Sequence, residues 1–184
     1  MKLLRTIQLD PSDRFVFEKA AAPGEWAVPG GFMFFGHDTG ALQGKERQAF
    51  RSGFLGLGSF GWSTLAVVQE ASEAEREQAV QALAAHLLAQ HGAPDQASAE
   101  IAAREEIAFA ASLCEHPVNT TIALLRRAEN GEIRETFRTL SMSAEEAGKD
   151  FSGGGFRVFS FVEEEGPEEH VDVAGLAGAG KPQA

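Results

Sequence analysis

Apolar and polar positions alternate in short stretches of the first third of the chain. Over residues 2–9 this alternation predicts a strand, and the turn residues Asp10-Pro11-Ser12-Asp13 predict that the chain returns as a second strand over residues 14–19. The segments 25–28 and 31–36 flank Pro29-Gly30-Gly31, which predicts two more short strands. Because residues 32–35 are apolar throughout, we expect the second of these to be central in a sheet or to form an interface.

The middle of the chain changes to a helical period. Ser72 and Glu75 form a capping box at the start of an apolar stripe that reaches Leu88, and Gly92 ends the helix. A second long helix is predicted from about residue 95 or 98 to 114, before Pro117. Upstream, residues 39–51 predict a shorter helix, with Gly44 as its weak point, and residues 62–71 predict a strand.

Two extended runs flank Asn130-Gly131, the pair favoured in a tight type I′ turn, so residues 120–140 predict a hairpin. Across a two-residue turn, opposed positions have numbers that sum to 261. One face therefore carries mostly apolar residues, with Arg126 opposite Glu135. The other face sets Arg127 opposite Arg134, with Arg138 two pairs along, and such like charges are locally unfavourable.

The order of these elements lacks the repeated strand–helix–strand signal of a parallel sheet. We therefore expect an α+β fold, with an antiparallel or mostly antiparallel sheet and two long helices packed on one face. A helical turn from Ser143 and a strand over 156–162 would complete a single domain at residues 1–165. Residues 166–184 are rich in Gly, Ala and Glu and are predicted to be a tail.

The chain carries a net charge of −11, from 16 basic and 27 acidic residues. The excess is concentrated in two segments, 72–106 and 163–184, and it opposes binding to nucleic acid and to anionic membranes. No apolar run is long enough to span a membrane, and the opening residues lack the apolar stretch of a secretory signal. With a single cysteine, Cys114, these features predict a cytoplasmic protein.

The sequence carries no recognised motif for catalysis, a cofactor or a metal. The stretch GLGSFG, residues 56–61, has the spacing of a dinucleotide-binding loop, but helix formers precede it and a strand follows, so it predicts a glycine-rich connector. His86 and His91 lie five residues apart, which does not place both on one helix face for a metal ion. Cys114 is interpreted as a buried structural residue. We expect no cofactor and no metal, and the sequence favours a non-catalytic protein over an enzyme.

The opening MKLLRTIQLDPSDRFVFEKAA, followed by PGEWAVPGGFMFF, resembles an uncharacterised bacterial protein family with no assigned function. The resemblance covers mainly the first 35 residues, and it implies no activity and no site residue.

Two function hypotheses follow from the residues. The first is a non-catalytic interaction or accessory protein that forms a homodimer or binds a protein partner. It rests on fourteen phenylalanines without any tyrosine. Its candidate interface residues are Phe32, Phe34, Phe35, Phe159 and Phe161. The alternative is a protein or enzyme that binds a small phosphate or carboxylate through the arginine-rich hairpin face, Arg127, Arg134 and Arg138.

Overall fold

The computed structural model describes residues 1–8, 12–129, 131–140 and 169–171. Within these ranges the fold is α+β. One antiparallel sheet has the strand order β4-β3-β2-β1-β5-β6-β7-β8. The strands are β1 (Lys2–Ile7), β2 (Trp26–Val28), β3 (Phe54–Gly56), β4 (Trp62–Ser63), β5 (Leu65–Glu70), β6 (Thr121–Glu129), β7 (Glu132–Leu140) and β8 (Glu169–Val171). The fold class predicted from the sequence is confirmed.

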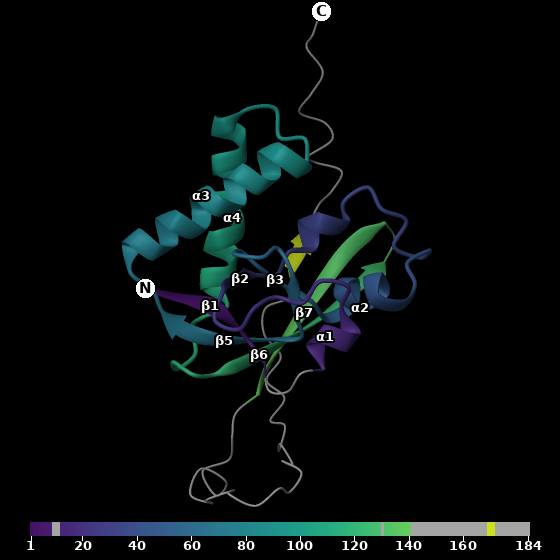
Figure 1. Ribbon diagram of the computed structural model, residues 1–184, viewed down its shortest axis with the longest axis horizontal. Coiled ribbons are helices and arrows are strands. Elements are labelled where there is room, and N and C mark those ends of the chain that lie inside the picture. Colours follow the sequence, from purple (N-terminus) through teal and green to yellow (C-terminus); the bar gives the residue numbers. More distant parts are fainter. Residues whose placement is uncertain (9–11, 130, 141–168, 172–184) are drawn as a thin grey trace, which may run out of the picture.

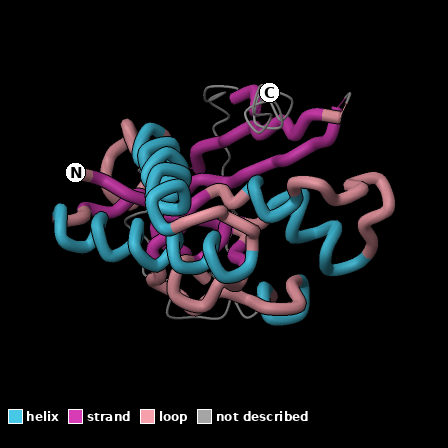
Figure 2. Tube along the Cα trace, turned by 90° about the horizontal axis from the view of Figure 1, so that it is seen from above, coloured by secondary structure: helices cyan, strands magenta, loops and turns pink. Residues whose placement is uncertain are grey.

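The two long helices are α3 (Glu73–Gln90) and α4 (Gln96–Ser112), and both begin where the sequence predicts. Ser72 and Glu75 make a reciprocal capping box, while Asp95 caps α4 by accepting a bond from the Ser98 amide. The two helices pack together, and α4 contacts β1 and β2. Figure 1 shows this pair together on one side of the molecule, with α1 and α2 on the other, and Figure 2 gives the same arrangement from above.

The hairpin of β6 and β7 has the predicted register throughout, from Thr121 opposite Leu140 to Glu129 opposite Glu132. The inward face of the hairpin is also as predicted. Ile122, Leu124 and Phe137 alternate with outward-facing residues and are buried in the main core. Phe137 packs edge-on against Phe109 of α4. A strand predicted for residues 156–162 and a helical turn from Ser143 lie outside the described residues.

Two predicted strands are wrong. Residues 13–16 form the short helix α1 (Asp13–Val16), because the buried carboxylate of Asp13 binds Thr64 and Ser63 and draws this segment onto the sheet rather than into it. The first strand pairs with β2 and β5 instead. Residues 31–34 form a 3-10 turn, η1 (Gly31–Phe34), entered through Gly30 at φ +76°.

The apolar run at 32–35 therefore packs around a turn, inside one chain. Phe34 is buried in a second cluster, with Phe17, Phe50 and Ile133, and Phe35 packs against the same cluster. Phe32 packs against the main core. Phe34 is buried within one chain, while Phe32 and Phe35 are half-buried, so the interface expected at these side chains stays a prediction. Phe159 and Phe161 lie outside the described residues.

The remaining helix, α2 (Gly44–Ser52), starts later than predicted because Gly44 lies at its first position with φ +53°. Its C-terminal end packs against β6. The strand predicted for residues 62–71 is divided at Thr64 into β4 and β5, which pair with different neighbours. At the far edge, β8 extends the sheet with three residues of the predicted tail, and the domain boundary at residue 165 stays a prediction.

Candidate functional site

A buried ion pair fixes the place where α2 meets the hairpin. Arg126 is 1% exposed, and its Nε donates to Oε1 of Glu135 at 2.6 Å. Its Nη1 donates to the carbonyls of Ala49 and Phe50 at the end of α2, at 3.4 and 2.6 Å. Its Nη2 donates to the carbonyl of Pro29 at 2.6 Å. One guanidinium thus joins three segments that are distant in sequence, and it satisfies the Phe50 carbonyl, which lies in the last turn of α2 where carbonyls lack an intrahelical partner.

The Pro29-Gly30-Gly31 segment is shaped around this pair. A Cβ on Gly31 would lie 2.8 Å from Oε1 of Glu135, so only glycine leaves room for the carboxylate. The amide of Gly30 donates to Oε1 of Glu106 on α4 at 3.0 Å, which ties the segment to the long helices. The sequence register pairs Arg126 with Glu135, but the burial of the pair depends on α2 and this turn.

A groove of about 340 Å³ opens above the buried pair, between α2 and the end of β6. Its charged lining consists of four arginines and one glutamate, a formal charge of +3 in a chain whose net charge is −11. Thr39 and Gly40 also line it. The lining residues are Thr39, Gly40, Arg47, Phe50, Arg51, Arg126, Arg127, Ala128 and Glu129.

Three of these arginines are exposed and come from two elements. Arg47 and Arg51 lie four residues apart on α2, which places them on one face of the helix, and Arg127 follows the buried Arg126 on β6. Among the described residues, none of the three has a carboxylate within 4.0 Å. Arginine side chains placed together without acidic partners are suited to bind phosphate or carboxylate.

The structure divides the arginine cluster predicted from the hairpin alone. Arg127 and Arg134 are opposed as predicted, but only Arg127 is among the residues that line the groove. The Nε of Arg134 lies 3.3 Å from Oε2 of Glu129, so an acidic neighbour on the adjacent strand offsets its charge. Arg138 is exposed and does not line the groove either. Sequence analysis missed Arg47 and Arg51, although their spacing on a predicted helix was visible.

The GLGSFG stretch, residues 56–61, binds the carboxylate of Glu25 from the same chain. Oε2 of Glu25 accepts bonds from the amides of Gly58 and Ser59, at 2.9 and 2.7 Å, and from the Ser59 hydroxyl at 3.0 Å. A Cβ on Gly56 would lie 2.6 Å from the same oxygen. Burial acts to raise the pKa of Glu25, but the hydrogen bonds from Ser59, Ala22 and Gly58 outweigh it and lower that pKa. The loop is a connector between β3 and β4, with its amides already used.

Two histidines that the sequence analysis set apart are brought together. Helix α3 ends before His91, so the helical angle between residues 86 and 91 does not apply, and the ring centroids lie 5.1 Å apart. His86 also stacks on Phe60 at 3.7 Å. Burial lowers the pKa of both histidines, and His86 is lowered further by His91 and Lys19. No group of three metal-ligating side chains occurs among the described residues.

The single cysteine is buried, as predicted. Cys114 is 2% exposed, and its Sγ lies 3.4 Å from the carbonyl of Ala110, to which the thiol donates. Burial raises the pKa of the thiol to about 12, and nearby Lys2 opposes this only in part. A thiol with such a pKa is protonated at neutral pH and is therefore a poor nucleophile.

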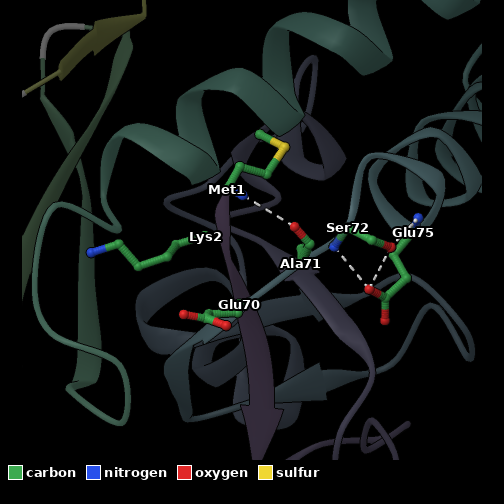
Figure 3. Close-up of a pocket in the computed structure, with 6 residues that line it drawn as sticks. All are labelled: Met1, Lys2, Glu70, Ala71, Ser72 and Glu75. Carbon is green, nitrogen blue, oxygen red and sulfur yellow. Dashed lines mark hydrogen bonds between the residues drawn. The ribbon is translucent and has the colours of Figure 1, made fainter.

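Another hollow, of about 590 Å³, lies at the start of β1 (Figure 3). Its polar groups already serve the fold: the Met1 nitrogen donates to the Ala71 carbonyl, and Ser72 and Glu75 bind each other in the capping box. Figure 3 shows the Lys2 side chain directed away from Ser72 and Glu75, and its ammonium donates to the His116 carbonyl. These groups do not converge on a common point, so the arginine groove is the stronger candidate.

Comparison with known protein families bears on most of the chain. A family described as a family of unknown function, DUF6505, matches residues 1–151. The chain belongs to the DUF6505 family. This match confirms the uncharacterised family expected from the first 35 residues and extends it through the hairpin. No curated protein and no solved structure matches the chain. Within the described ranges, no helix combines the length and the apolar character needed to cross a membrane.

Proposed function

We propose that this DUF6505 member binds a small phosphate- or carboxylate-bearing molecule in the groove between α2 and β6. The observation that supports the proposal is the meeting of Arg47, Arg51 and Arg127, from two elements, without acidic partners among the described residues. Holding three like charges together costs free energy in the empty protein, and a bound anion would offset that cost.

The buried pair beneath the groove supports the proposal as well. Arg126 holds the end of α2 to β6, so Arg51 and Arg127 are carried on elements whose relative position is fixed. A site built on rigid elements loses less conformational entropy on binding than one built on loops. The groove volume of about 340 Å³ is at the lower end of small-molecule sites, which favours a compact anion.

The test uses the full chain at low ionic strength, with inorganic pyrophosphate and citrate as probes. We expect a saturable rise in the thermal midpoint, of about 3–5 °C at ten times the dissociation constant, since that occupancy adds about 1.4 kcal/mol to a domain of this size. Arg51→Gln and Arg127→Gln should each reduce the rise.

Arg14→Gln is the matched control, because Arg14 is an exposed arginine on α1 that does not line the groove. It should leave the rise unchanged. Equal shifts in all three variants would show that the anions act through general charge screening, and the absence of any shift in the wild type would refute the proposal.

Self-association and an accessory role in the cytoplasm stay proposals. Their support is the phenylalanine content of the chain, including the half-buried Phe32 and Phe35. Light scattering at micromolar concentration measures the mass directly, and a monomer would remove self-association.

A further inference from the structure

A third hollow lies on the opposite flank of α2, and its chemistry differs from that of the arginine groove. It has a volume of about 280 Å³. Its α2 residues, Lys45, Glu46 and Ala49, face away from Arg47 and Arg51 because of the 3.6-residue turn. The other lining residues are Glu18, Lys19, Met33, Phe34, His37, Leu42 and Trp62.

The floor of this hollow is aromatic and fixed in place. The rings of Phe34 and Trp62 stack with centroids 5.4 Å apart and an interplanar angle of 27°. Trp62 lies against two glycines, since a Cβ on Gly53 would be 2.6 Å and one on Gly30 3.3 Å from its ring. A flat apolar surface held this way suits a second ring. The volume is about twice the 150 Å³ cavity that accepts benzene, so it accommodates one ring and a short polar substituent.

The rim carries charges of both signs. Lys19 and Lys45 oppose Glu18 and Glu46, a formal sum of zero with His37 neutral. Among the described residues, none of these four side chains has an oppositely charged group within 4.0 Å. Cations and carboxylates that surround one hollow without pairing complement a ligand that itself carries both charges.

We propose that this hollow binds a small aromatic zwitterion, of which an aromatic α-amino acid is the simplest example. The ring lies against Trp62, the ligand carboxylate meets the lysines, and its ammonium group meets the glutamates. The site is separate from the arginine groove and does not depend on the function proposed for it.

Trp62 gives a direct readout. The chain has two tryptophans, and Trp26 lies on β2 beneath the guanidinium of Arg5, outside the hollow. In a Trp26→Phe background, fluorescence excited at the red edge reports on Trp62 alone. We expect L-phenylalanine to change the emission saturably. Three analogues each lack one recognised group and should bind about tenfold more weakly. They are hydrocinnamate, without the ammonium group, phenethylamine, without the carboxylate, and L-leucine, without the ring.

Variants test the rim separately. Lys45→Gln and Glu46→Gln should each weaken L-phenylalanine binding about tenfold, whereas Glu105→Gln, at an exposed position on α4, should not. Arg51→Gln should leave it unchanged, which separates this site from the anion groove. Equal binding of L-phenylalanine and either singly charged analogue would overturn the zwitterion assignment, and an unchanged emission spectrum would overturn the site.

Discussion

Adjacent arginines on β6 should respond in opposite ways to the same substitution. Arg126→Met removes the only cation that contacts the buried carboxylate of Glu135 among the described residues, together with donors to the carbonyls of Pro29 and Phe50. Arg127→Met, one residue along, changes an exposed side chain without an ion pair within 4.0 Å in the same ranges.

The magnitude follows from burial. Removing one partner of a buried ion pair costs about 3–5 kcal/mol, because the remaining charge stays out of water without compensation. That is a fifth or more of the stability of a typical domain, about 5–15 kcal/mol. The exposed Arg127→Met should change the free energy of unfolding by no more than about 0.5 kcal/mol.

Urea denaturation followed by tryptophan fluorescence measures both variants. Two further variants keep the comparison informative if Arg126→Met does not fold. Arg126→Lys retains the charge but not the planar fork, so its stability should lie between wild type and Arg126→Met. The double variant Arg126→Met with Glu135→Leu removes both charges and should recover at least part of the loss. Similar stabilities of Arg126→Met and Arg127→Met would refute the reasoning.

Three further predictions concern stability. Glu25→Gln replaces a carboxylate that accepts four hydrogen bonds, three of them from the glycine-rich loop. Urea denaturation at pH 7 should show a loss of about 1–3 kcal/mol in the free energy of unfolding, while Glu18→Gln, at an exposed position, should be nearly neutral. Gly61→Ala places a Cβ 2.6 Å from the backbone of Ala20, so it should lower the free energy of unfolding by about 1–3 kcal/mol or more. Gly40→Ala meets only the Asp38 side chain and should be tolerated. Equal losses of stability in the two variants would contradict the packing argument. In the folded protein His86 and His91 have pKa values below their ordinary 6.5, so the unfolded chain binds more protons near and below that pH. The contribution of the two histidines to stability should therefore be complete above pH 6.5 and should fall as the pH decreases below it. His86→Gln with His91→Gln should flatten the stability profile between pH 7 and pH 5, and an unchanged slope would show that other groups dominate.

Elements set by local chemistry could be predicted from the sequence. The capping box fixes the start of α3, and Asn130-Gly131 fixes the two-residue turn that pairs Arg126 with Glu135. These features depend on residues within a few positions of one another, so pattern and turn chemistry suffice. The burial of Cys114 was likewise predicted from its place in an apolar helix end.

The tertiary structure decided what non-local contacts control. Residues 13–16 and 31–34 have strand-like patterns but do not form strands. Asp13 binds residues about fifty positions away, and the 31–34 turn packs against the buried pair of Arg126 and Glu135. These distant partners override the local preference. The candidate sites are non-local for the same reason. Arg127 could be named from the hairpin. Its meeting with Arg47 and Arg51 depends on how α2 is held against β6, by the bonds from Arg126 and by the packing of Phe50, and no sequence spacing records these contacts.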